Sequence, residues 1–427
     1  MDLLSHASSP NTASPASDSQ RTSQTDPASS KTPPASSAYF WFLAGTGSWF
    51  TAIGMQGVLF SWLVVGVLNA EAKWVGIAQS AMMIPSILLA LPGGTIADRY
   101  DQRRMLMTLH LIASGISVSL VLVVANNQLS MPLLLAYAVG MGTVQAFVMP
   151  ARDALLSQVA SADMLRSVVG MTMTQWGMQV LGSLLAGTAR WIGTVSALGL
   201  HTLTLLAGIP LLQKLSVSPE PRSHGNLRWA DIIEGVWEVK RSPALSATLL
   251  LSVAVGVFFI GPFLVVLPLL VRDVYGGGVG QLALLNMTFP LGTILGSISI
   301  LWRGGLRHKG TAQLTSLLCG AGCLGTVSLG LPFWGTLLAV GAWGISASIF
   351  INAGRTVYQE QASAANRARV LSVYTIGFMG AAGLLGAPLS GVLVDSVGPL
   401  MTCIVASGAM IVVVGYSFVC TTITQVK

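Results

Sequence analysis

The side chains best suited to chemistry in this sequence are one carboxylate and the arginines that follow it. Asp98 is followed by Arg99, Arg103 and Arg104, and Gly94 precedes it. A carboxylate can accept hydrogen bonds from the N-terminal end of a neighbouring helix, or it can pair with an arginine. Such a contact can form in one arrangement of the helices and break in another. These residues are therefore candidates for a switching contact, and for Arg103 and Arg104 a role in orienting the chain alone is the alternative.

A second group of charges stands where two later apolar segments are expected to end. Arg152 and Asp153 follow one of these segments, and Arg355 takes the equivalent place after the other. We expect Arg152 to pair with Asp98 or with Asp153 in one state of the switch, because all three lie at the same ends of neighbouring segments.

The composition defines the elements that must position these charges. Of the 427 residues, 53% are apolar and only 9% are charged, and the mean hydropathy is +0.71. A soluble chain carries about 25% charged residues, so this composition predicts an integral membrane protein. The net charge of +7 does not indicate nucleic-acid binding, since the basic residues are scattered between apolar runs rather than gathered on one face.

The apolar runs have the length of membrane-spanning helices, about 20 residues each. Their continuous apolar character excludes a β-barrel, whose strands alternate. The chain is therefore predicted to be an all-α membrane protein of twelve transmembrane helices. The predicted spans are 39–68, 74–97, 105–126, 131–151, 165–190, 192–213, 244–271, 278–302, 310–330, 333–354, 368–394 and 397–420.

The basic residues predict the orientation. Under this assignment nineteen of the 22 fall on one side, and only Lys73, Arg190 and Arg272 fall on the other. The positive-inside bias then places both termini in the cytoplasm. Residues 1–38, with eleven Ser, five Pro and no aromatic residue, are expected to form a disordered cytoplasmic tail, and a cleaved presequence is the alternative.

The two halves of the chain are related. A shift of 203 residues superimposes Arg104 on Arg307, Arg152 on Arg355 and Arg166 on Arg369. This repeat predicts two pseudo-symmetric six-helix bundles, the signature of a transporter with its site between them. The predicted units are a bundle at 39–213, a linker at 214–243 and a second bundle at 244–427. Residues 226–241 are expected to form an amphipathic helix, either at the membrane interface or packed on the helix ends.

The motif around Asp98 resembles the Gly-x-x-x-Asp-Arg-x-Gly-Arg-Arg/Lys signature of the major facilitator superfamily. Gly94, Asp98, Arg99, Arg103 and Arg104 fit this signature, whereas Asp101 and Gln102 depart from it. The flanking residues resemble the branch of the enterobactin exporter and related efflux proteins. They include Gly47-Ser48-Trp49, Trp62, Pro85, Glu234-Gly235 and Arg272.

The resemblance implies the major facilitator fold and alternating access, with Asp98 and its basic neighbours holding the cytoplasmic gate. It also implies that the first, fourth, seventh and tenth helices line the substrate cavity. Intramembrane polar groups usually face such a cavity, which favours Gln56, Gln145 and Asn352 as substrate contacts, with Trp62 in an apolar wall. For each polar residue, an interhelical hydrogen bond is the alternative.

The expected function is export of a small amphipathic compound, siderophore-like or drug-like, across the inner (cytoplasmic) membrane by proton-coupled antiport. An importer or a lysophospholipid-type flippase is the alternative on this fold. No Asp or Glu lies at mid-depth in a span, which argues against a strongly charged substrate and leaves the proton carrier unassigned. The sequence predicts a monomer that is no enzyme and has no cofactor, metal or nucleic-acid partner.

Overall fold

A computed structural model describes residues 35–160, 164–216, 229–306, 308–362 and 367–425. The tail predicted for 1–38 lies almost entirely outside these residues. Within the described ranges the chain consists of helices and short connections, with no strand. This agrees with the predicted all-α class.

The N-terminal half contains six membrane-crossing segments. The first is α1 with a π-helical turn, η1, and the second is divided between α2 and α3 at Leu89. The elements are α1 (Ala35–Trp62), η1 (Leu63–Val67), α2 (Ala72–Leu88), α3 (Ala90–Arg99), α4 (Gln102–Ala125), α5 (Met131–Val159), α6 (Met164–Gly187), α7 (Ala189–Ile192) and α8 (Thr194–Gln213).

The C-terminal half repeats this plan after the linker helix α9 (Trp229–Arg241). Its first crossing again ends in a π-helical turn, η3, as the first half does at η1. The elements are α10 (Pro243–Val255), η2 (Gly256–Ile260), α11 (Gly261–Leu269), η3 (Leu270–Val274), α12 (Val279–Trp302), α13 (Lys309–Val327), α14 (Phe333–Gln361), α15 (Arg367–Ala381), η4 (Ala382–Gly386), α16 (Ala387–Val397), α17 (Pro399–Cys420) and the short 3-10 turn η5 (Ile423–Gln425).

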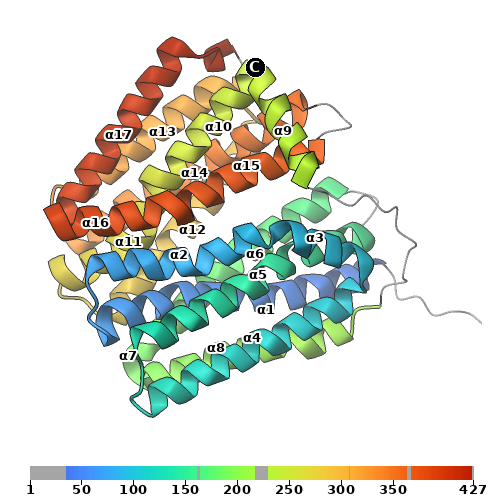
Figure 1. The fold of residues 1–427 in the computed structure, drawn as a ribbon, viewed down its shortest axis with the longest axis vertical. Helices are drawn as coiled ribbons and strands as arrows, with labels where there is room; N and C mark the ends of the chain where they lie inside the picture. Colours follow the sequence, from blue (N-terminus) through green and yellow to red (C-terminus); the bar gives the residue numbers. More distant parts are fainter. Residues whose placement is uncertain (1–34, 161–163, 217–228, 307, 363–366, 426–427) are drawn as a thin grey trace, which may run out of the picture.

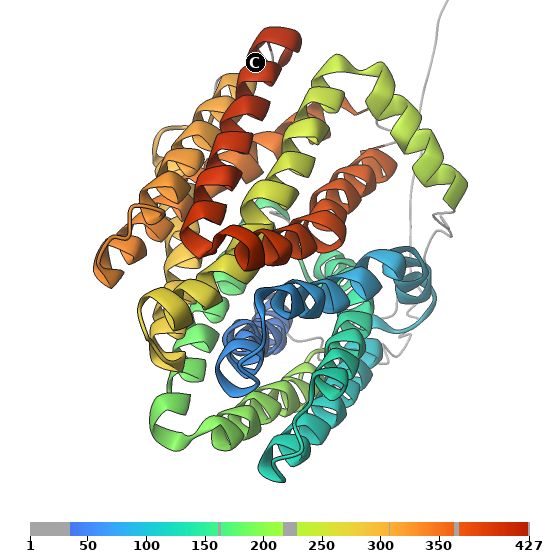
Figure 2. The same cartoon turned by 60° about the vertical axis from the view of Figure 1, so that its left-hand side comes forward.

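These segments form twelve crossings in two six-helix bundles, as predicted. Figure 1 shows α1–α8 in one bundle and α10–α17 in the other, and Figure 2 shows the same division after rotation. Among the described residues, nine helical segments are long and apolar enough to span a membrane by length and composition alone. The other three predicted crossings are α2 with α3, α6, and α13.

Two crossings extend seven or eight residues beyond the predicted spans at their C-terminal ends. The span predicted to end at 151 continues to Val159 in α5, and the one predicted to end at 354 continues to Gln361 in α14. Each of these helices has 29 residues, which is more than a ~30 Å hydrocarbon core needs. Arg152, Asp153 and Arg355 therefore lie inside helices rather than at their ends.

The bundles meet along two helix pairs, α2 with α16 and α6 with α12. Glycines allow the first pair to approach closely. A Cβ atom on Gly391 of α16 would lie 2.7 Å from the carbonyl oxygen of Ala72 in α2, and one on Gly76 would strike the carbonyl of Ala387. We call the end of the molecule that holds η3 and α7 the α7 end, and the opposite end the α9 end (Figure 1).

Candidate functional site

The glycine pair of the predicted motif has two different environments in α3. Gly93 is buried where α3 meets α5, and a Cβ atom there would lie 2.5 Å from the carbonyl oxygen of Ala146. Gly94 has open space around it. The close helix contact is therefore made at Gly93, not at the motif residue Gly94. Asp98 lies one residue before the end of α3, and its side chain is outside the described residues.

The arginines of the motif differ in their contacts. Arg103 donates from Nε to the carbonyl oxygen of Leu212 at 2.9 Å and from Nη2 to that of Gln213 at 2.5 Å. These are terminal carbonyls of α8, where a cation is favourable. Arg104 is 84% exposed and pairs loosely with Asp101, with 3.8 Å between Nε and Oδ2. Arg99 is exposed at the end of α3.

This difference predicts that Arg103 stabilises the fold, whereas Arg104 does not. Arg103→Gln should lower the free energy of unfolding by about 1 kcal/mol, because it removes a charged cap from α8. Arg104→Gln is the matched control and should leave it unchanged. Denaturant unfolding in detergent micelles would measure both. Equal values for the two variants would contradict the assignment.

Arg152 makes one of its two predicted contacts. Its Nε and Nη2 atoms donate to Oδ1 of Asp153 at 3.0 and 2.6 Å, and its guanidinium lies 5.2 Å from the ring centroid of Phe50. Arg152 itself is 8% exposed. The alternative contact with Asp98 falls on a side chain outside the described residues. Arg355, the repeat partner of Arg152, is exposed on α14.

The four residues expected in the substrate cavity lie on α1, α5 and α14. Gln56 is buried and donates to the sulfur of Met82 at 3.5 Å, and Asn352 donates to the carbonyl of Ser348 within its own helix at 2.8 Å. Gln145 has a buried Oε1 with no partner among the described residues. Trp62 lines a recess of about 420 Å³ between the bundles, beside Arg190 and the start of α12.

A carboxylate that the sequence reasoning did not select joins the bundles at the α7 end. Asp395, near the end of α16, accepts hydrogen bonds from the backbone N–H groups of Ala72 and Lys73, each at 2.9 Å. These groups belong to the first turn of α2. Its own N-cap residue, Glu71, makes no side-chain cap. The cap of α2 therefore comes from the opposite bundle.

A cation makes the complementary contact beside it. Nη1 of Arg272 in η3 donates to the carbonyl oxygens of Ala70 at 2.8 Å and Val65 at 3.3 Å, and to Oδ1 of Asn69 at 3.4 Å. These acceptors lie at the C-terminal end of the first crossing. Arg272 also pairs with Asp273. We refer to Asp395 and Arg272, with the helix ends they bind, as the interbundle latch.

One sequence signal could have found this latch. Acidic residues contribute little to membrane topology, so a carboxylate at the end of a span requires another explanation. Asp395 lies one residue beyond the predicted span 368–394 and meets that criterion. Arg272 is one of only three basic residues predicted on the non-cytoplasmic side of the membrane. Because the positive-inside bias does not explain a basic residue there, Arg272 also requires another explanation.

A comparison with protein families settles the class of this arrangement of two bundles. The model described as Major Facilitator Superfamily matches residues 42–381, well over half of the chain. The chain belongs to the major facilitator superfamily. It is therefore a multi-pass membrane transporter rather than an enzyme, as the sequence predicted.

One curated protein matches part of the chain. The Staphyloferrin A transporter of Staphylococcus aureus (strain NCTC 8325 / PS 47) is 29% identical over 122 residues, which are 28% of this chain. The match spans 29% of that relative's length.

Solved transporters share the fold at low sequence identity. A mutant of the nucleoside transporter NupG has a TM-score of 0.75 at 12% identity, covering 89% of this chain and 99% of that one. A bacterial homologue of the human lysosomal transporter Spinster, inward-facing and unoccupied, has a TM-score of 0.67 at 14% identity, covering 92% and 96%. At these identities the likeness concerns the fold alone.

Proposed function

We propose that this transporter exports a small amphipathic compound, siderophore-like or drug-like, in exchange for protons. The observation that carries the proposal is the partial match to a protein named as a siderophore transporter. The resemblance of the flanking motifs to the enterobactin-exporter branch supports the same direction and cargo. No feature of the described residues favours the importer or flippase alternative.

The interbundle latch supports alternating access. Its bonds join side chains of one bundle to helix ends of the other, so they can break when the bundles rock apart at the α7 end. We assign this end to the outer face of the inner membrane, because Lys73, Arg190 and Arg272 all lie there. Both termini are then cytoplasmic. We propose that the protein acts as a monomer in the bilayer.

The motif residues would hold the opposite, cytoplasmic gate when the latch is broken. In that state Asp98 would cap a helix or pair with Arg152, supported by Gly94, Arg99, Arg103 and Arg104. Arg152 with Asp153, and Arg355 in the second bundle, would form the moving charges at this end. Gln56, Gln145 and Asn352 remain the proposed substrate contacts, with Trp62 placed toward the outer end.

Linker helix α9 would lie at the cytoplasmic membrane surface. It packs on α15, where Glu234 pairs with Arg369 at 2.6 Å, and it leaves Ile233, Val236 and Trp237 largely exposed. An exposed apolar stripe is typical of a helix that rests in the headgroup region.

Everted membrane vesicles would test the export function. With a proton gradient imposed, the protein should accumulate a siderophore or a lipophilic cation inside the vesicles, and a lysophospholipid serves as the third probe. Accumulation of the lysophospholipid alone would favour the flippase instead. Vesicles without the protein, and vesicles with a protonophore, are the controls. Folded protein that accumulates none of the probes would contradict the proposal.

A further inference from the structure

Linker helix α9 presents a row of exposed side chains that points away from the bundle. Ile233, Val236 and Trp237 are 59%, 46% and 53% exposed. With Lys240 they follow the i, i+3, i+4, i+7 spacing of one helix face. We call these four residues the α9 stripe. An exposed apolar row of this kind marks a contact surface for a membrane or a partner.

Two contacts fix how α9 lies on the C-terminal bundle. Gly235 packs so closely on α15 that a Cβ atom there would lie 3.0 Å from the carbonyl oxygen of Arg369. At the other end of α9, Ser242 alone separates it from α10, and Ser246 of α10 donates to the carbonyl oxygen of Val239 at 2.6 Å. The helix therefore lies across the starts of the seventh and eleventh crossings, and Figure 1 shows it in this place.

The length of the seventh crossing indicates the depth of α9 in the membrane. This crossing runs over Pro243–Val274 and has 32 residues. At about 1.5 Å per residue it is about 48 Å long. A bilayer with both headgroup regions is about 45 Å thick. With Val274 at the outer face, Pro243 lies in the cytoplasmic headgroup region, and α9 joins the crossing there.

The C-terminal end of the stripe is basic. Nζ of Lys240 lies 5.3 Å from the ring centroid of Trp237, and the exposed Arg241 follows it in the last turn of α9. Glu234 and Glu238 fall outside the stripe, and Glu234 is already held in an ion pair with α15. An apolar row that ends in two cations is complementary to a lipid surface with negatively charged headgroups.

We propose that the α9 stripe, together with Arg241, docks on anionic lipid headgroups of the cytoplasmic leaflet; this placement rests on the proposed assignment of the α9 end to the cytoplasm. Ile233, Val236 and Trp237 enter the boundary between headgroups and acyl chains. The two cations bind the lipid phosphates. The eleventh crossing is then tied to the leaflet through α9 at one end and to α2 through Asp395 at the other.

Spin-label accessibility in liposomes tests docking without any substrate. Val236→Cys places a label on the stripe, and Gln361→Cys places the control label at the exposed end of α14, both in a background that lacks the four cysteines. In liposomes that contain anionic phosphatidylglycerol, oxygen should reach the label at 236 and a water-soluble nickel complex should not. The label at 361 should show the reverse.

Access of the nickel complex to the label at 236 in these liposomes would overturn the proposal. If the same label were protected in native membranes, a partner protein would be the occupant of the stripe instead. These measurements need no transport, so they stand or fall separately from the export function.

The same label tests whether lipid charge is recognised. Replacement of phosphatidylglycerol by phosphatidylcholine should expose the label at 236, and so should the double variant Lys240→Gln, Arg241→Gln in phosphatidylglycerol. Each cation should change the ratio of docked to free helix about fivefold. Lys73→Gln, which removes a cation at the α7 end, is the matched control and should change nothing. Equal immersion in both lipids and in the double variant would overturn recognition of anionic headgroups.

Discussion

Asp395→Asn is expected to shift the carrier away from the arrangement in which the bundles meet at the α7 end. The carboxylate accepts two backbone hydrogen bonds at the positive end of α2, and a neutral amide can replace only one oxygen. Because Asp395 is exposed, we expect a loss of about 1.4 kcal/mol. That corresponds to about a tenfold change in the ratio of the two states.

Spin labels at the α7 end would measure this shift. Ile192→Cys and Val397→Cys place labels on exposed positions of the two bundles, in a background that lacks the four cysteines. The population with a long label separation should grow in Asp395→Asn. Lys73→Gln is the matched control, because it removes a charge from the same helix end but keeps the backbone N–H that Asp395 binds. An equal shift in both variants would indicate general electrostatics rather than capping.

Gly261→Ala is expected to have the largest effect on stability. Gly261 begins α11 where the seventh crossing meets the eleventh, and a Cβ atom there would strike the backbone of Gly386, 2.7 Å from its Cα. The π-helical turns η2 and η4 pack against each other at this contact between the two segments, so neither backbone can move aside easily. We expect destabilisation of about 3 kcal/mol, at the upper end for overpacking.

Thermal unfolding in detergent would test this expectation with Gly380→Ala as the control. Gly380 lies on α15 of the same eleventh crossing, and a Cβ atom there would meet nothing within 4 Å. Gly380→Ala should therefore unfold like the unaltered protein, while Gly261→Ala should unfold at a clearly lower temperature. Equal unfolding temperatures would show that the backbones at Gly261 and Gly386 can move apart to admit a Cβ atom without loss of stability.

The twelve crossings were predictable because the length of an apolar run and the charge of a loop can be read from consecutive residues. The sequence did not predict which glycines pack closely against another helix. Gly380 and Gly386 look alike in the sequence, and both lie in the predicted eleventh span, yet only Gly386 contacts the seventh crossing. The difference depends on how two distant segments are rotated against each other, which local spacing does not encode.

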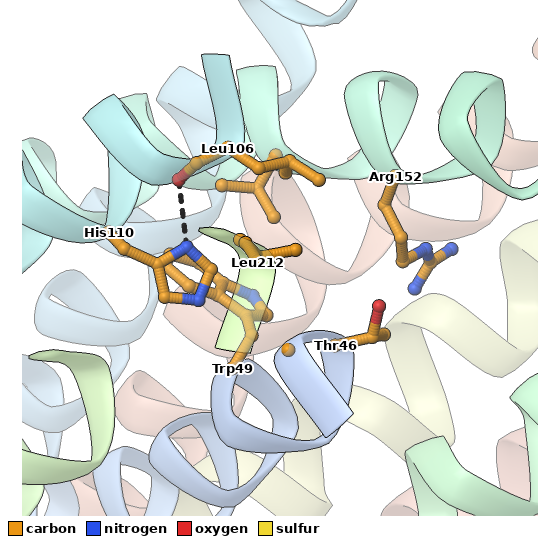
Figure 3. Close-up of a pocket in the computed structure, with 8 residues that line it drawn as sticks. Thr46, Trp49, Leu106, His110, Arg152 and Leu212 are labelled. Atoms are coloured by element: carbon orange, nitrogen blue, oxygen red, sulfur yellow. Dashed lines mark hydrogen bonds between the residues drawn. The ribbon is translucent and has the colours of Figure 1, made fainter. Parts of the chain in front are cut away.

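In the candidate site, too, the sequence predicted local contacts but not contacts between distant helices. Arg152 beside Asp153 was predictable because adjacent opposite charges on one helix can pair. The capping of α8 by Arg103 and of α2 by Asp395 joins residues 109 and 323 positions apart, and each depends on the packing of complete helices. His110 lies on α4, the third crossing, which is not among the helices implied to line the substrate cavity. It nevertheless lines a small cavity inside the N-terminal bundle (Figure 3).

The interbundle latch has an electrical consequence. Moving one elementary charge through 100 mV of membrane potential changes the energy by about 2.3 kcal/mol. Arg272 and Asp395 carry opposite charges, lie at the same end of the molecule and belong to the same bundle, so they move together. Their contributions to gating charge then cancel, and separation of the bundles at this end is electrically silent as far as these two residues are concerned. Any voltage dependence of the transport cycle would originate in the transported charges or elsewhere in the chain.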